Sequence, residues 1–369
     1  MNKTIGSNNI TVFPIFPEQF ILYLLFFVFG TISSAVGIGG GGLYIPLFIL
    51  LSGFELKTII PLVVISILAN SFIRMVILIP KKHIYNENHK LIDYFIASQI
   101  MCFDASGSYI GYYLNTIIET YVLKWLIFTL LLMTGLKTLQ KARQMYKIFL
   151  KTKDQDNEVT IDGISIIIPR NDGITLNEHT GNVSLYKTKL LIVGYQLVFI
   201  IFFVLRYIFD NNIIVILCQS IFSLISGCYV TYLNYKYQPS INIKMNLKGL
   251  IFISFCALLI GILSTMLGIG GGMLVSPLLL LLKVDSNVVM ATNSMTTFFS
   301  ALTSSLQYII VGNIKYDFML MFLILSGISS KLGLSYAKLI NNRCSSSWPM
   351  ILFLGIVILI AGILIAVTK

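Results

Sequence analysis

The chain has 369 residues, of which 56% are hydrophobic and 11% charged, and its net charge is +11. A soluble domain contains about 25% charged residues, so this composition excludes a water-soluble globule and indicates a polytopic membrane protein. No basic segment is interleaved with aromatic residues, so the positive charge is assigned to membrane loops rather than to nucleic-acid binding.

The five cysteines lie in or beside apolar segments, and the three histidines are dispersed in polar segments. No CxxC pair occurs, so the cysteines are predicted to pack in the interior rather than to form disulfides or bind metal. We predict no metal, no cofactor and no catalytic residues, and we expect that the protein is not an enzyme.

Residues 1–18 form a polar N-terminal tail without the features of a secretory signal, and residues 19–140 are predicted to be a first membrane repeat. It begins with a span at Gln19–Val36, followed by a glycine cluster. Leu43–Leu51 is apolar but too short to cross about 30 Å of hydrocarbon, which predicts a half-helix. Full spans are expected at Thr58–Pro80, Leu91–Leu114 and Tyr121–Leu139.

Residues 141–189 are predicted to be a basic and hydrophilic loop. Its positive charges follow a span directly, which places it on the cytoplasmic side or its equivalent in an organelle. Within it, Val159–Pro169 has the composition of a strand or hairpin. Residues 190–236 are predicted to form a central helical hairpin with spans at Leu190–Phe209 and Ile213–Tyr235.

The second membrane repeat is predicted over residues 237–369, with a half-helix at Met273–Leu282. Its full spans are expected at Leu247–Leu267, Asn287–Val311, Phe318–Ile340 and Trp348–Val367. The expected fold is an all-α polytopic membrane protein with two homologous helical repeats, each containing a glycine-rich broken or re-entrant helix. Whether the half-helices re-enter or cross, and whether the repeats are parallel or inverted, stays open at this level.

Two matching stretches organise these repeats: GIGGGGLYIPL from Gly37 to Leu47, and GIGGGMLVSPL from Gly268 to Leu278. Glycine is a poor helix former and proline lacks a backbone donor, so each stretch is expected to interrupt a helix. Unpaired backbone groups cost several kcal/mol in hydrocarbon, so an interruption persists only where it is buried in protein or lines a cavity.

A half-helix that starts at such a break presents free N–H groups and a positive dipole end, which suit an anion. The alternative is that the glycines only permit close helix packing, as GxxxG does, but two matching clusters favour a site. The predicted substrate-binding backbone is Gly37, Gly39, Gly40 and Gly41 with Gly268, Gly270, Gly271 and Gly272, and the predicted structural breaks are Pro46 and Pro277.

The span after each break supplies candidate polar partners. In the second repeat, hydroxyl and amide side chains at helical spacing suit an oxyanion, although such groups often bond to their own helix. These residues are Thr292, Asn293, Thr296 and Ser300. The first repeat offers a thinner set, namely Ser66, Asn70, Ser71 and Arg74. Arg74 is predicted either to reach the interface or to attract an anion.

Asp104 is an acid well inside a predicted span. An intramembrane carboxylate is a functional candidate, and here it is a candidate for proton coupling. The alternative is a structural carboxylate, paired with an arginine or bonded to Ser106 or Ser108.

These motifs resemble the TauE/SafE family of membrane transporters, the sulfite exporter family. PKKHIYNENHKLIDYFIASQI, FDASGSYIGYYLN, ATNSM and LILSGISSKLGLSYAKLI are similar to its eukaryotic branch. The resemblance implies transport of anions such as sulfite, thiosulfate or organosulfonates, and no enzymatic activity. Pro61-Leu62-Val63 stands where the second repeat has Thr292-Asn293-Ser294, which moves the expected substrate site to the second break.

The leading hypothesis is a secondary transporter of a small anion, such as a sulfur oxyanion or organosulfonate, coupled to protons. The alternatives are a channel or a transporter of another small solute, such as an organic acid or a metal ion, and a non-transporting membrane scaffold. The expected partners are the anion and the lipid bilayer of the plasma membrane or an organelle.

Overall fold

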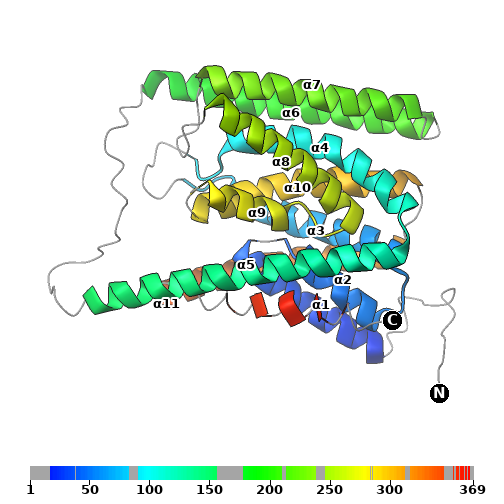
Figure 1. The fold of residues 1–369 in the computed structure, drawn as a ribbon, viewed down its shortest axis with the longest axis vertical. Coiled ribbons are helices and arrows are strands. Elements are labelled where there is room, and N and C mark those ends of the chain that lie inside the picture. The colour runs from blue at the N-terminus through cyan, green and yellow to red at the C-terminus, as the bar shows by residue number, and fades with distance from the viewer. Residues whose placement is uncertain are drawn as a thin grey trace.

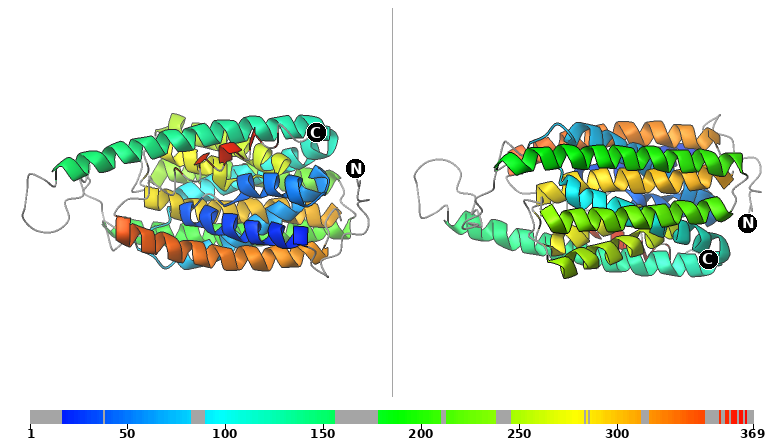
Figure 2. Two further views of the ribbon diagram at one scale, coloured as in Figure 1. Left: turned by 90° about the horizontal axis from the view of Figure 1, so that it is seen from below. Right: turned by 90° about the horizontal axis from the view of Figure 1, so that it is seen from above.

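A computed structural model of the chain describes residues 17–37, 39–82, 90–155, 178–209, 213–237, 246–282, 284, 286–311 and 316–344, and scattered positions between 352 and 365. These residues contain eleven helices, which run along one another as a bundle (Figure 1, Figure 2). Within them the β-type pairing is an isolated bridge between Lys82 and Lys90, and no strand occurs. The predicted all-α architecture is confirmed.

Six of the described helices are long and apolar enough to cross a membrane. They are α3 (Leu56–Leu78), α5 (Thr120–Gln155), α6 (Glu178–Ile208), α7 (Ile213–Tyr237), α8 (Leu247–Leu267) and α11 (Tyr316–Cys344). α4 (Tyr94–Ile117) and α10 (Ser286–Val311) have sufficient length, at 24 and 26 residues, but carry rows of buried polar side chains that make them less apolar. The chain is an integral multi-pass membrane protein.

Each glycine cluster separates two helices. α1 (Pro17–Val36) is followed by α2 (Gly41–Leu51), and α8 is followed by α9 (Gly272–Leu281). The glycines with positive φ in the two clusters are Gly37, Gly39, Gly40, Gly268 and Gly270. This left-handed conformation strains any residue with a Cβ, which explains why glycines occupy these turns.

The prolines do not mark the interruptions. Pro46 lies inside α2 and Pro277 lies inside α9, and both helices continue past them. Each proline removes one intrahelical hydrogen bond, whereas the left-handed backbone conformations occur at the glycines before it. The role of structural break therefore belongs to the glycines.

The basic segment after Leu139 is helical in its first part, contrary to the predicted loop. α5 continues to Gln155, and α6 begins at Glu178. Residues 137–155 contain neither glycine nor proline and are rich in lysine, leucine and glutamine, so helix propensity extends α5 beyond the bundle (Figure 2). The predicted strand at Val159–Pro169 lies outside the described residues, and so does most of the predicted span at Trp348–Val367.

Helices from the two halves of the chain pack against one another. α4 packs along α8, α1 packs along α11, and α3 packs against α10. Gly111 of α4 allows close approach of α8, because a Cβ there would overlap the carbonyl oxygen of Ile262. Gly333 of α11 does the same against the carbonyl oxygen of Thr31 in α1. The α6–α7 hairpin lies along one side of the bundle, opposite α1 (Figure 1).

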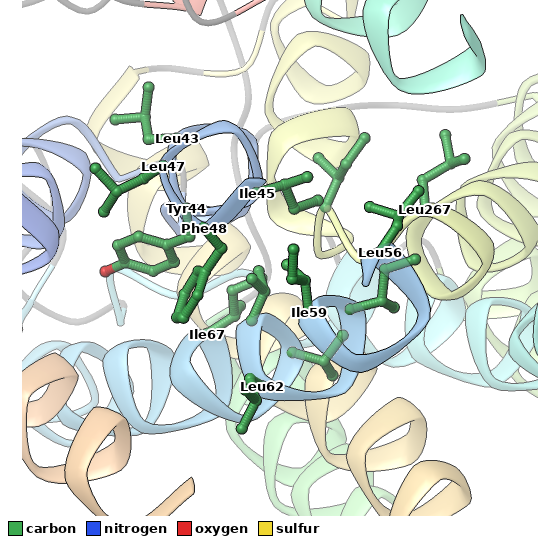
Figure 3. Close-up of a cluster of buried hydrophobic side chains, with 14 of the residues drawn as sticks. Leu43, Tyr44, Ile45, Leu47, Phe48, Leu56, Ile59, Leu62, Ile67 and Leu267 are labelled. Carbon is green, nitrogen blue, oxygen red and sulfur yellow. The ribbon is translucent and has the colours of Figure 1, made fainter. Parts of the chain in front are cut away.

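An apolar cluster holds α2 against α3 and the end of α8 (Figure 3). It includes Tyr44 and Phe48 from α2, Ile59 and Leu62 from α3, and Leu267 from α8. Within a bilayer such contacts stabilise by close van der Waals packing rather than by exclusion of water. The cluster therefore positions the first break against the second, since α2 begins at one and α8 ends at the other.

Candidate functional site

The two glycine breaks touch inside the bundle. A Cβ on Gly41 would overlap the backbone carbonyl oxygen of Ile269, and a Cβ on Gly42 would lie 2.7 Å from Met273 Sδ. α3 and α10 border the contact, because Ile67 lies against Gly270 and Thr297 lies against Gly39. The N-terminal ends of α2 and α9 are thus brought together although they are far apart in sequence.

Arg74 of α3 lies at the first break and is 0% exposed. Its Nη2 donates to the carbonyl oxygen of Gly37 at 2.8 Å and to Ser294 Oγ at 2.6 Å. Asn293 Nδ2 donates to the same Gly37 oxygen at 2.8 Å. The Nε and Nη1 atoms of Arg74 have no hydrogen-bond partner, and no acidic side chain among the described residues forms an ion pair with it. A buried guanidinium without a counter-charge favours the binding of an anion beside it.

A second unpaired group lies one helical turn before Arg74. Asn70 is fully buried, and neither its Nδ2 nor its Oδ1 has a hydrogen-bond partner. The Tyr44 hydroxyl is also buried and without a hydrogen-bond partner. Gly40, which precedes α2, is left-handed and has no side-chain cap, so the N-terminal end of α2 lacks a side-chain acceptor. The first break therefore combines donors, a cation and unsatisfied polar atoms.

The second break faces a carboxyl group. A Cβ on Gly271 would lie 2.9 Å from Ser300 Oγ and 3.5 Å from Asp104 Oδ1. Ser300 and Asp104 are 4% and 3% exposed, and these two oxygens have no hydrogen-bond partner. An anion at this helix end would meet Asp104, so the two breaks differ in charge.

The structure divides the side chains that the sequence grouped on α10. Asn293 lies at the first break rather than the second, because α10 crosses from one break to the other. The Thr292 hydroxyl accepts from the backbone N–H of Asp93 at 3.0 Å. Thr296 donates to the Asn293 carbonyl of its own helix at 3.1 Å. Of the four, only Ser300 faces the second break.

The sequence did not indicate two further buried polar groups. Tyr44 stands in the apolar sequence of α2, where nothing marks its hydroxyl as part of a site. Arg206 of α6 is 1% exposed, with its guanidinium 5.7 Å from the Tyr109 ring and 5.6 Å from the Phe203 ring. The docking of α6 on α4 buries it.

Discontinuous helices whose interruptions meet inside a multi-pass bundle are typical of membrane transporters. The profile of the family described as "Sulfite exporter TauE/SafE" matches residues 10–138 and 176–366. The chain therefore belongs to the TauE/SafE family and is a membrane transporter, and the resemblance identified from its motifs is confirmed.

Relatives in two organisms resemble the chain. Sulfite exporter TauE/SafE family protein 1 of Arabidopsis thaliana is 24% identical, over 93% of this chain and 82% of the relative. Family protein 6 of the same plant is 24% identical, over 95% of this chain and 81% of the relative. The Probable membrane transporter protein YunE of Bacillus subtilis (strain 168) is 31% identical, over 25% of this chain and 36% of the relative. No solved structure matches the chain.

Proposed function

We propose that the protein is a secondary transporter of a small anion, either a sulfur oxyanion or an organosulfonate. The observation that carries this proposal is the fully buried Arg74, which has two unpaired nitrogen atoms and no acidic partner among the described residues. A buried charge without a counter-charge costs several kcal/mol, and a bound anion offsets that cost. The names of the Arabidopsis relatives, which refer to sulfite export, support a sulfur oxyanion.

We also propose that the chain contains two inverted repeats, within residues 19–140 and 237–369, separated by the basic segment of residues 141–189 and the hairpin of residues 190–236. Matching contacts support the repeat: Gly37 lies against Met290 of α10, and Gly268 lies against Ile60 of α3. Each break thus contacts the equivalent helix of the other half.

The orientation follows from α3 and α10. The rings of Phe72 and Phe298 are 5.6 Å apart, and Arg74 bonds to Ser294, so rising residue numbers on α3 meet falling numbers on α10. Equivalent helices that run antiparallel support inverted rather than parallel repeats. In this arrangement the substrate lies near the bilayer midplane between the repeats, and rocking of one repeat against the other alternates access.

Asp104 is the proposed proton-coupling residue. It is buried, its Oδ1 has no hydrogen-bond partner, and it faces the second break. An intramembrane carboxylate in this setting is suited to take up and release a proton during transport.

Flux into proteoliposomes tests the function directly. Sulfite, thiosulfate, sulfate and taurine are offered with and without a pH gradient, and protein-free vesicles serve as the control. We expect saturable uptake of a sulfur anion, accelerated when unlabelled anion is present on the other side. A channel does not show this acceleration. If none of the four anions is transported or bound, the proposal is wrong.

A matched pair of variants tests the break. Gly271→Leu places a side chain against Ser300 and Asp104, so we expect flux to be lost while the protein still inserts into the membrane. Gly194→Leu, at a position on α6 with no atom within 4 Å of an added Cβ, is expected to keep wild-type flux. Normal flux in Gly271→Leu would contradict a binding role for the second break.

A further inference from the structure

Two unpaired polar side chains converge on the start of α9. Asp104 Oδ1 and Ser300 Oγ both lie near the position that a Cβ on Gly271 would take, and neither has a hydrogen-bond partner. Both residues are more than nine-tenths buried. The Ser300 hydroxyl faces the Asp104 carboxyl group. Both atoms lie beside the N-terminal end of α9, which has ten residues.

The first N–H groups of a helix have no intrahelical acceptor and carry a partial positive charge. A carboxylate placed against them occupies the position that a sulfate-like anion would otherwise take. The first break has no such occupant, because Gly40 has no side-chain cap. The Ser326 hydroxyl of α11, which donates to the Ser66 carbonyl beside the first break, carries no charge. Among the described residues, the second break is therefore the one with an acidic side chain beside it.

The charged and titratable groups around Asp104 are few. Those on α4 itself and on the helices packed against it in this region are Cys102, Tyr109, Tyr195, Arg206 and Cys256. Tyr195 is held by a hydrogen bond to Ser223 of α7 at 3.1 Å, and Arg206 lies over the Tyr109 ring. α9 contributes no titratable side chain, and among the described residues no second acid and no histidine faces Asp104. The charge at this helix end therefore depends on the protonation of Asp104.

We propose that the N-terminal end of α9 is a second oxyanion-binding position, which Asp104 occupies while ionised and leaves open to a sulfur oxyanion when protonated. This inference rests on the proposed anion transport, in which Arg74 marks the first position. Ser300 then donates to the incoming oxyanion, and the protonated carboxyl group donates a hydrogen bond instead of repelling the anion. Occupation of the second position is coupled to one proton.

Equilibrium binding of radiolabelled thiosulfate to the purified full chain tests this inference. The charge of thiosulfate is the same at mildly acidic and mildly alkaline pH, so any change in binding reports on the protein. The wild type is expected to bind one anion per chain at alkaline pH and two at acidic pH. Asp104→Asn is expected to bind two anions per chain at both pH values. Asp104→Glu is expected to keep the pH dependence of the wild type.

Ser300→Ala provides a second test, which does not depend on the folding of an Asp104 variant. Loss of one hydrogen bond is expected to weaken the second position about tenfold and to leave the first unchanged. One anion per chain at both pH values, in the wild type and in Asp104→Asn, overturns the inference and leaves anion transport standing. An unchanged second position in Ser300→Ala also overturns it. If no variant binds thiosulfate and no anion is transported, the proposed function fails as well.

Discussion

Replacing Arg74 by methionine separates a substrate-binding role from a structural one. The substitution keeps much of the side-chain volume and removes the charge together with all five N–H donors. In the protein without substrate, Arg74 makes hydrogen bonds to the Gly37 carbonyl and to Ser294 Oγ. The Gly37 oxygen retains its bond from Asn293 in the variant, so no buried carbonyl is left unpaired.

The expected magnitude follows from the two nitrogen atoms of Arg74 that lack partners. A hydrogen bond to a charged group contributes about 1.5–3 kcal/mol, so an oxyanion that accepts from both gains about 3–6 kcal/mol. This corresponds to a factor of about 10²–10⁴ in Kd. In the absence of anion, the lost hydrogen bonds and the removal of an uncompensated buried charge act in opposite directions, so the thermal stability of Arg74→Met is expected to stay close to that of the wild type.

The assay measures thiosulfate binding and thermal unfolding of the purified chain, with and without the anion. At mildly alkaline pH, where only the first position binds, we expect thiosulfate to raise the Tm of the wild type but not that of Arg74→Met. Arg74→Lys keeps the charge but lacks the planar donor fork, and it is expected to bind with intermediate affinity. Lys331→Met removes an exposed cation of α11 and serves as the control. If Arg74→Met kept wild-type binding while its Tm without anion fell sharply, Arg74 would be only a cap on the end of α1.

Two further substitutions test the packing that positions the site. Gly41→Ala places a methyl group over the carbonyl oxygen of Ile269, so we expect a destabilisation of at least about 1–3 kcal/mol and loss of flux. Gly194→Ala, with open space around it, is its control, and wild-type Tm and flux in Gly41→Ala would show that the breaks do not touch. Gln99→Leu removes three hydrogen bonds, to the Leu250 carbonyl and Ser254 Oγ of α8 and from Asn234 Nδ2 of α7, with an expected cost of about 2 kcal/mol in thermal unfolding and no change in thiosulfate Kd. A changed Kd would extend the site to the contact that Gln99 makes.

The sequence predicted most of the helices because lipid imposes a simple rule. Every backbone polar group inside hydrocarbon must be satisfied, so long apolar runs become helices and glycine clusters within them become interruptions. The ends of α3, α7 and α8 lie within a few residues of their predicted positions. The prediction failed after Leu139, because charge there signalled a loop while local helix propensity extended α5.

Family membership and the location of both breaks were also accessible from the sequence, because the GIGGG motif is local and glycine is required by the backbone itself. Which of the two breaks binds the substrate could not be predicted from the sequence. Counting polar side chains downstream of each glycine cluster assumed that a span serves the break before it. In the folded protein α10 begins beside the first break, where Asn293 contacts Gly37, and reaches the second break only at Ser300.

The sequence by itself therefore determined a multi-pass helical membrane protein with two glycine-interrupted helices, because these features depend on composition and on neighbouring residues. Only the tertiary structure decided which groups meet at each interruption. Arg74 and Asn70 lie at the first, and Asp104 and Ser300 lie at the second. The physical reason is that helices of the first half pack against helices of the second half. This packing brings together residues far apart in the chain and leaves no periodic trace in the sequence.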